Sequence, residues 1–458
     1  MTLVRSEYGV GAGYAVSDGV VVVWPDERQD VGAVSSGSVF CRHRVFPAGQ
    51  VVPLRIEGDD GVAPLEVAEL DYVVPSVGPN PNGRIGPTRD VTGAPPDAPV
   101  REVTNLNPSG PGSFVEALNT AGPARVVFRV PGVIDLGGHD AVVRGSYVTI
   151  DGSTMPGVTI TNGQLLLRDV HDVVIQHVVI RGGLRVHDPT TYKMDCISLD
   201  HAWRVIIDHC SLSWGTDELI GISGPRFAGS SPAEWRENTS HDVTISNSLL
   251  AEDLETYALN PGGERSHGVL AHDNVRGVTM HNVLSVSNGR RSPILVKGGG
   301  EALLANVYSI NSFKNGPVYA LLSDEWAGYP PQVGQMSMLG CVHKEGNNTI
   351  EPSSFYWKTQ GGNPEMFMDD VVMLSSGGVE KPDRLIQPNG ESFVELPDPH
   401  RIHYEMPVRH SSELLSYLVN EVGAHPTNRD AVDQRIIQSV LDGSTQIISH
   451  ENDVGGLP

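Results

Sequence analysis

The chain has few cysteines and no long apolar run. Its four cysteines, Cys41, Cys196, Cys210 and Cys341, are widely spaced and form neither a Cys-x-x-Cys pair nor a zinc pattern. Cys196 and Cys210 fall in strand-like runs, where we expect small buried thiols. No run approaches about 18 apolar residues, and residues 1–5 open no apolar segment. We therefore expect neither a membrane span nor a signal peptide in this form.

Positive charge and aromatic side chains are also scarce. There are 32 Lys and Arg against 55 Asp and Glu, a formal net charge of −23, which argues against a general nucleic-acid binder. The same charge repels an anionic polysaccharide, so such a substrate would need a locally basic groove. Aromatic residues make up only 6%, whereas 51 glycines and 33 prolines suit a fold with many tight corners.

One short phrase recurs along the middle of the chain. An apolar, β-branched triplet is followed by a polar residue and then by His or Asn, at residues 173–177, 205–209, 243–247 and 278–282, with a weaker copy at 303–306. The first four copies start 32, 38 and 35 residues apart. A repeat of this length predicts a solenoid.

Each copy is too short for a helix and reads as a strand. Stacked coils would pair these strands in parallel, form inner columns of Val and Ile, and let the recurrent Asn or His hydrogen-bond along the stack. We predict an all-β fold, a right-handed single-stranded parallel β-helix. A β-sandwich, the alternative, would need hairpin turns about every 8 to 12 residues, and the sequence does not show them.

The rest of the chain divides by composition. Residues 1–76 alternate short apolar runs with turn residues and predict a small β-rich N-terminal module. Residues 77–100 are rich in Pro and Gly and predict a linker or arm. Residues 101–410 carry the β-helix, opened by a short capping helix after Ser113, with Glu116 completing a capping box. Residues 411–458 show helical spacing and predict two helices that pack on the solenoid.

Several motifs together resemble the bacterial pectate lyases of the large parallel β-helix superfamily. The most specific runs from Asp208-His209-Cys210-Ser211 through Trp214-Gly215 to Asp217-Glu218. The resemblance is collinear from about residue 101 to the end and leaves the first 90 residues or so unmatched. The other matching segments are residues 103–113, 195–198, 265–268, 291–293 and 429–433.

The resemblance implies cleavage of a galacturonan by β-elimination. An arginine removes the proton α to the uronate carboxylate, while Ca²⁺ and basic side chains hold that carboxylate. This chemistry is physically consistent, because neutralising the carboxylate stabilises the enolate-like charge that develops. An arginine base needs a strongly basic setting, since guanidinium normally stays protonated.

Carried over residue by residue, the resemblance places calcium ligands at Asp195, Asp217 and Glu218. Carboxylates on neighbouring coils can converge on one face, as Ca²⁺ requires. Solvated acids at coil corners are the alternative interpretation, and Asp208 and His209 are interpreted as mainly structural.

The catalytic arginine falls at Arg291, with adjacent Arg290 kept as a second candidate. Lys297 lies one position after the place where the relatives carry a further basic residue that binds substrate. His267 is either a site residue or a packed imidazole. We expect the acidic residues and the arginines to face one groove.

Two departures bear on the cofactor. Relatives often carry paired acids where this chain has Met194 and Asp195, which removes a possible ligand. They usually carry a substrate lysine where this chain has Arg265, which keeps the charge and adds a bidentate grip on carboxylate. In both departures the chain resembles the calcium-independent pectin lyases of the same fold. The sequence therefore leaves a calcium-independent reaction open as an alternative to a calcium-dependent one.

Other functions are weighed against the lyase. A hydrolase on this fold needs two or three carboxylates facing one bond, and no Asp-Asp pair followed by Gly-His-Gly occurs. A glycan-binding phage tailspike or adhesin is kept open by the unmatched N-terminal residues. It would be a trimer, whereas a solitary lyase is expected to be a monomer. We expect an extracellular or virion-associated protein whose partner is an acidic polysaccharide.

Overall fold

The chain forms two compact units in a computed structural model, Met1–Arg84 with Leu396–Glu405, and Ile85–Glu395 with Met406–Pro458. The structure describes residues 2–6, 9–13, 21–23, 28–30, 51–57, 68–73, 86–119, 121–183, 194–255, 266–360, 362–386, 393–399 and 406–457. Within these residues no helix is long and apolar enough to cross a membrane.

The first unit contains short antiparallel strands. A two-stranded sheet joins β1 (Thr2–Ser6) to β2 (Gly9–Gly13). A four-stranded sheet has the order β4 (Arg28–Asp30), β3 (Val21–Val23), β5 (Val51–Glu57) and β6 (Ala68–Val73). The β-rich character expected of the N-terminal residues is therefore present, while the boundary at residue 76 stays a prediction.

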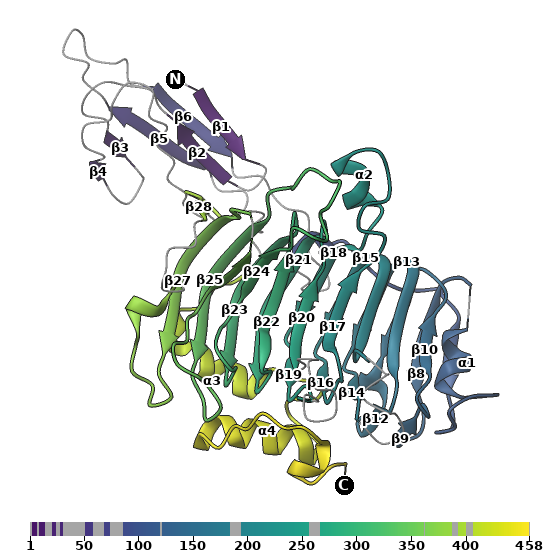
Figure 1. The fold of residues 1–458 in the computed structure, drawn as a ribbon. Helices are drawn as coiled ribbons and strands as arrows, with labels where there is room; N and C mark the ends of the chain where they lie inside the picture. Colours follow the sequence, from purple (N-terminus) through teal and green to yellow (C-terminus); the bar gives the residue numbers. More distant parts are fainter. Residues whose placement is uncertain are drawn as a thin grey trace. The chain divides into compact units, whose positions relative to one another are not determined.

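The second unit is a parallel β-helix with three faces, which confirms the predicted fold class (Figure 1). Long strands bend at the corners and so contribute to two faces. The first face contains β10 (Asp140–Val143), the first halves of β13 (Gln164–Gln176) and β15 (Ile197–Asp208), then β17 (Glu218–Ser223), β20 (His267–Ala271), β22 (Arg290–Lys297), β24 (Val318–Leu321) and β26 (Trp357–Gln360).

The other two faces continue each coil. The second face contains β7 (Val100–Val103), β8 (Ala124–Phe128), β11 (Val148–Asp151), the second halves of β13 and β15, β18 (His241–Ser246), the first halves of β21 (Arg276–Val286), β23 (Glu301–Ile310), β25 (Gln335–Lys344) and β27 (Glu365–Leu374), and β28 (Val394–Glu395). The third contains β9 (Gly132–Asp135), β12 (Val158–Thr161), β14 (Val179–Arg181), β16 (Ser211–Ser213), β19 (Leu249–Ala251) and the remaining halves of β21 to β27.

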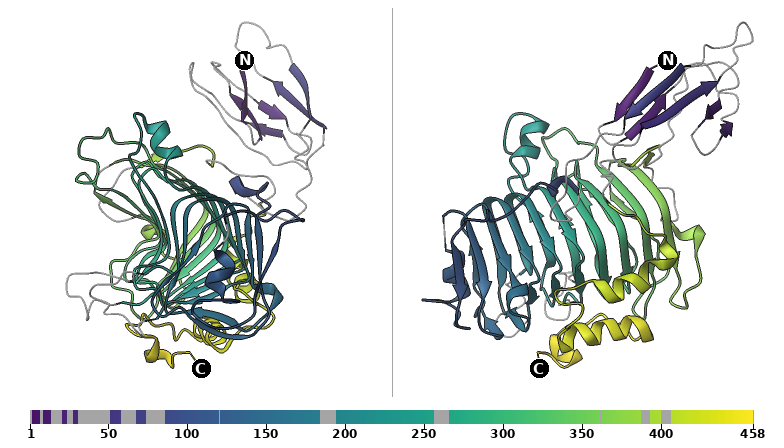
Figure 2. Two further views of the ribbon diagram at one scale, coloured as in Figure 1. Left: turned by 90° about the vertical axis from the view of Figure 1, so that its right-hand side faces the viewer. Right: turned by 180° about the vertical axis from the view of Figure 1, so that it is seen from behind.

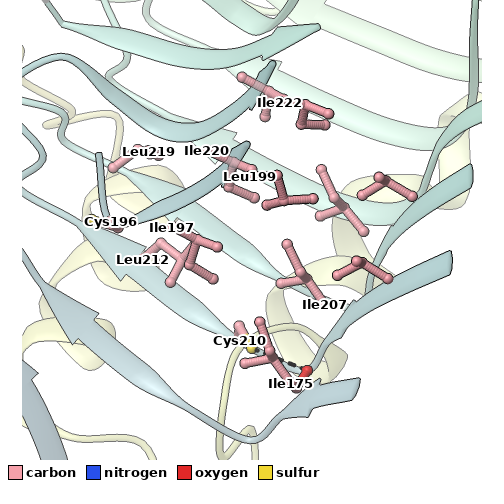
Figure 3. Close-up of a cluster of buried hydrophobic side chains, with 14 of the residues drawn as sticks. Ile175, Cys196, Ile197, Leu199, Ile207, Cys210, Leu212, Leu219, Ile220 and Ile222 are labelled. Atoms are coloured by element: carbon pink, nitrogen blue, oxygen red, sulfur yellow. Dashed lines mark hydrogen bonds between the residues drawn. The ribbon is translucent and has the colours of Figure 1, made fainter. Parts of the chain in front are cut away.

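The recurrent phrase sets the register of the second face. Val173 pairs with Val205, Val205 with Val243, and Val243 with Val278, so the repeated positions lie one above another. Side chains from successive coils fill the interior, as the stacked Ile, Leu and Cys residues in Figure 3 show. Cys196, Cys210 and Cys341 are buried free thiols, and Cys41 lies outside the described residues. The solenoid core is thus a set of continuous apolar columns.

The polar residue that ends each phrase forms a ladder at a corner. Asn306 Nδ2 donates to Asn282 Oδ1 (2.9 Å), Asn282 to Asn247 (3.0 Å), and Asn247 to Asp208 (2.8 Å). All three asparagines have positive φ, a conformation that Asn adopts more readily than most residues. In the earlier coils the same corner position holds stacked imidazoles, His177 and His209, 4.9 Å apart. The predicted hydrogen bonding along the stack is present for the asparagines, whereas the His177 and His209 rings stack on each other and hydrogen-bond to Ala424 O and Asp208 Oδ2 instead.

Helices cover the end and one face of the solenoid (Figures 1 and 2). α1 (Phe114–Leu118) has the predicted Ser113 N-cap, with Ser113 Oγ accepting from the Glu116 N–H (3.2 Å), and Phe114 packs on Phe128 in the core. The Glu116 side chain accepts from the Gly112 N–H instead of the Ser113 N–H, so the predicted capping box is not completed. The others are α2 (Pro232–Glu237), α3 (Ser411–Glu421), α4 (Ala431–Asp442) and the short 3₁₀ turns η1 (Gly86–Thr88), η2 (Gly152–Thr154), η3 (Pro382–Arg384) and η4 (Glu451–Val454). α3 and α4 bury their apolar sides on the third face, which confirms that the C-terminal helices pack on the solenoid.

The described part of the Pro- and Gly-rich segment lies on the second face. Val91 is buried with Val174 and Ile206, and the Ala94 N–H donates to Thr149 Oγ1 (2.9 Å). From residue 86 onward this segment therefore packs as an arm against the solenoid. The assignment of residues 77–100 as a separate part stays a prediction.

Candidate active site

A groove of about 770 Å³ lies on the outside of the first face. Its walls come from β17, β20, β22 and β24 and from segments before and after them. Six residues that the sequence singles out line it: Asp217, Glu218, His267, Arg290, Arg291 and Lys297. Asp195 lies beside Glu218, whose N–H donates to Asp195 Oδ1 (3.1 Å), and Arg265 falls outside the described residues. The acids and the arginines therefore share one groove.

One end of the groove is a cluster of carboxylates. Asp217 directly precedes β17, Glu218 opens it, and Asp195 precedes β15 one coil earlier. Asp195 fits against β17 because Gly221 has no side chain: a Cβ there would lie 2.3 Å from Asp195 Oδ2. Burial and the charge of Asp217 raise the pKa of Asp195 to about 7. Such mutual repulsion among acids is relieved by a bound cation.

His267 completes this end. Its Nδ1 lies 3.5 Å from Glu218 Oε1 and 3.9 Å from Asp217 Oδ1, so the imidazole lines the acidic end of the groove. The His267 N–H donates to Asp253 Oδ2 (2.7 Å). The backbone of His267 is thus fixed to a buried acid.

Asp253 is an acid that the sequence reasoning missed. It is fully buried, and its Oδ1 has no hydrogen-bond partner within the described part of the chain. Burial raises its pKa well above the usual range, and the charges of Asp217 and Asp195 add to the shift. The coil register could have revealed it, because Asp253 follows β19 in the position that Gly215 takes after β16, one coil before.

The donor set fits Ca²⁺. Asp195, Asp217 and Glu218 supply carboxylate oxygens, the ligands that Ca²⁺ prefers. Asp253, whose Oδ1 has no hydrogen-bond partner among the described residues, adds a fourth carboxyl group next to this cluster. Ligand atoms of Asp217, Glu218 and His267 lie within 4.8 Å of one another. The residues present can therefore hold a divalent cation.

Arg291 projects from a bulge in β22. The pairing of β20 with β22 shifts from His267–Arg290 to Val269–Ile294, and Arg291 has a φ of +52°. Its guanidinium pairs with the carboxylate of Glu218. Burial lowers the pKa of Arg291, against the opposing charges of Asp217 and Asp195. A lowered pKa is what an arginine needs to accept a proton.

Arg290 is held differently from its neighbour. Its Nη1 donates to Glu255 Oε2 (2.8 Å), and its guanidinium lies 4.8 Å from the ring centroid of Phe313. Both contacts fix the side chain at the wall of the groove. Of the two candidate bases, the geometry therefore favours Arg291.

The bulge depends on Gly268 in the neighbouring strand. A Cβ at Gly268 would lie 2.4 Å from the Arg291 carbonyl oxygen and 2.6 Å from that of Pro293. We expect Gly268→Ala to lower the free energy of unfolding by about 1–3 kcal/mol, because the backbone of β22 must move. Gly122→Ala is the matched control, since a Cβ there meets nothing within 4 Å. Equal urea midpoints for the two variants would contradict this packing.

Lys297 lies at the other end of the groove. It is six residues beyond Arg291 on the same strand, up to about 20 Å along an extended chain. Its Nζ pairs with Glu325 and lies 3.7 Å from Asp273 Oδ2. Between the two charged ends the floor is apolar, formed by Leu270, Leu295, Val318, Ala320 and Leu322. The groove thus suits an extended ligand with an apolar face and spaced charges.

The sequence and the fold were compared with those of known proteins. No family model matches the chain. A probable pectate lyase C of Aspergillus terreus is 30% identical over 345 residues, covering 72% of this chain and 70% of that protein. A probable pectate lyase C of Emericella nidulans is 28% identical over 348 residues, with 72% and 69% covered. In fold, the crystal structure of the major allergen from cedar pollen aligns with a TM-score of 0.53 at 16% identity, covering 74% of this chain and 92% of the allergen.

Proposed function

Because the chain belongs to the pectate lyase family, we propose that it cleaves a pectate-like (1,4)-α-D-galacturonan by β-elimination. The observation that supports this most is the shared groove, in which Arg291 meets the carboxylates of Asp217 and Glu218. The apolar floor fits the faces of sugar rings, and the basic side chains along the walls fit uronate carboxylates. The substrate would be an acidic polysaccharide met outside the cell.

Arg291 is the proposed base. It removes the proton α to the uronate carboxylate, the bond from the adjacent carbon to the glycosidic oxygen breaks, and a carbon–carbon double bond forms in the new non-reducing end. The leaving oxygen takes up a proton and becomes the new hydroxyl group. Burial of the guanidinium favours this role, because it lowers the pKa of Arg291.

The remaining residues would position the substrate. Asp195, Asp217 and Glu218 are the proposed Ca²⁺ ligands, and bound Ca²⁺ would neutralise the uronate carboxylate and so acidify the α-proton. Arg290 lines the groove as a carboxylate partner, Lys297 lines its other end, and His267 orients the acidic end. Arg265 is proposed for substrate binding on the resemblance alone.

A calcium-independent reaction is the second candidate. The ion pair between Arg291 and Glu218 already neutralises one proposed ligand with a side chain of the protein. Arg290 and Lys297 add positive charge to the same groove. Basic side chains alone would then stabilise the developing charge on the substrate.

Activity on polygalacturonate and on methylated pectin, with and without Ca²⁺, tests the proposal. We expect unsaturated oligouronides that absorb in the ultraviolet, and a loss of about a hundredfold in rate when a chelator removes Ca²⁺. Chelator-resistant cleavage of methylated pectin would favour the calcium-independent reaction. Reducing ends without ultraviolet product, or a trimer that binds uronan without cleaving it, would contradict the lyase.

A further inference from the structure

A second charged cluster forms the end of the groove away from Arg291. Lys297 from β22 and Arg226 from the turn after β17 face two acids, Asp273 and Glu325. Arg226 Nη1 lies 2.8 Å from Asp273 Oδ2 and 2.8 Å from Glu325 Oε2, and Lys297 Nζ pairs with Glu325. Ligand atoms of His272, Asp273 and Glu325 lie close together, but these two cations already neutralise the carboxylates. The cluster is therefore an ion network of the protein itself.

The two acids differ in what surrounds them. Asp273 is fully buried and also accepts from Trp326 Nε1 (2.8 Å) and contacts His272 Nδ1 (2.9 Å). Its pKa is lowered because these hydrogen bonds and the charge of Lys297 outweigh its burial. The Glu325 side chain is 32% exposed and lines the groove together with Lys297. Asp273 is thus part of the scaffold, and Glu325 is the acid that a ligand meets.

The turn that carries Glu325 is fixed. The N–H groups of Glu325 and Trp326 both donate to the Leu322 carbonyl (3.0 and 3.3 Å). Trp326 packs edge-on against Phe227, with ring centroids 5.0 Å apart, and against Trp235. The Glu325 carboxylate is therefore held over Lys297 and Arg226.

From this geometry we propose that Glu325 determines specificity by occupying the place that a substrate carboxylate would take on Lys297 and Arg226. This end of the groove then disfavours a free uronate, because two carboxylates would share the same cations. It accepts a uronate whose carboxyl group is uncharged, as a methyl ester is. The inference rests on the proposed function, since it assigns a substrate preference to the same groove.

Glu325→Gln tests the inference, with Glu102→Gln as the control. Gln keeps the size of the side chain, and Asp273 remains as a partner of both Lys297 and Arg226. Glu102 pairs with Arg129 (2.7 Å) on the surface, outside the groove lining, so its substitution changes the net charge equally. We expect Glu325→Gln to lower the KM for polygalacturonate by about fivefold and to leave that for highly methylated pectin unchanged. Glu102→Gln should change neither.

Direct binding separates this inference from the proposed function. Calorimetric titration with saturated trigalacturonate needs no turnover, and Glu325→Gln should bind it about fivefold more tightly than the wild type. If neither protein forms unsaturated product but the variant binds more tightly, the lyase proposal fails and the role of Glu325 stands. If the wild type is an active lyase and the variant binds trigalacturonate no more tightly than the wild type, the role of Glu325 is overturned. An equal fall in the KM for methylated pectin would overturn it as well. Glu325→Ala, if its thermal unfolding is unchanged, should also bind trigalacturonate more tightly than the wild type.

Discussion

Replacing Arg291 with alanine is expected to lower kcat on polygalacturonate by about 10²- to 10⁴-fold, the usual contribution of a positioned base. The side chain lies in the groove beside Asp217 and Glu218, and burial lowers its pKa toward the range in which it accepts a proton. Formation of unsaturated product, followed by ultraviolet absorbance at saturating substrate, measures the loss.

Arg290→Ala is the matched control for this result. It removes the same charge from the adjacent position, but Arg290 is tied to Glu255 and stacked on Phe313. We expect it to raise KM more than it lowers kcat, because it removes binding rather than proton transfer. Equal losses of kcat in the two variants, with unfolding unchanged, would contradict the assignment of Arg291 as the base.

Asp433→Asn is expected to give the largest loss of stability, about 3–5 kcal/mol in the free energy of unfolding. Asp433 on α4 accepts from Arg181 Nη2 (2.6 Å) and from Ser211 Oγ (2.5 Å), and the Arg181 side chain is 0% exposed. Without this charge, the carboxylate that remains paired with Arg181 in the described part of the chain is Asp430, whose side chain is 30% exposed. A buried guanidinium would then be poorly compensated.

Denaturant unfolding measures this effect, and Asp442→Asn at the end of the same helix is the control. Asp442 is exposed and hydrogen-bonds only near its own turn among the described contacts, with Ser444 and Gln438. Its substitution should leave the unfolding midpoint in place. A small loss for Asp433→Asn would show that α4 is not anchored to the solenoid through Arg181.

The fold could be predicted because the repeat carries its own register. The Asn or His that closes each phrase occupies a corner with positive φ, and Asn247, Asn282 and Asn306 hydrogen-bond to one another in series. A side chain that both tolerates this backbone conformation and donates along the stack must recur once per coil. The hydrophobic triplets before it then fall into columns.

The candidate site was predicted less completely, because loops set part of it. Asp217 and Arg291 line the same groove, because Asp217 directly precedes β17 and Arg291 lies near the start of β22, two strands of the first face. Glu325 enters from a turn whose position depends on packing around Trp326, and no local pattern marks it. Asp253 is recognisable only once the coil register is known. The bulge at Arg291 likewise depends on Gly268 in another strand.

The products formed from polygalacturonate test the central claim most directly. If Arg291 and the carboxylates of one groove cleave uronan by β-elimination, each break yields an unsaturated end that absorbs in the ultraviolet, in equal number to the new reducing ends. Arg291→Ala should lower both signals together. New reducing ends without ultraviolet absorbance, or undiminished product from Arg291→Ala, would contradict it.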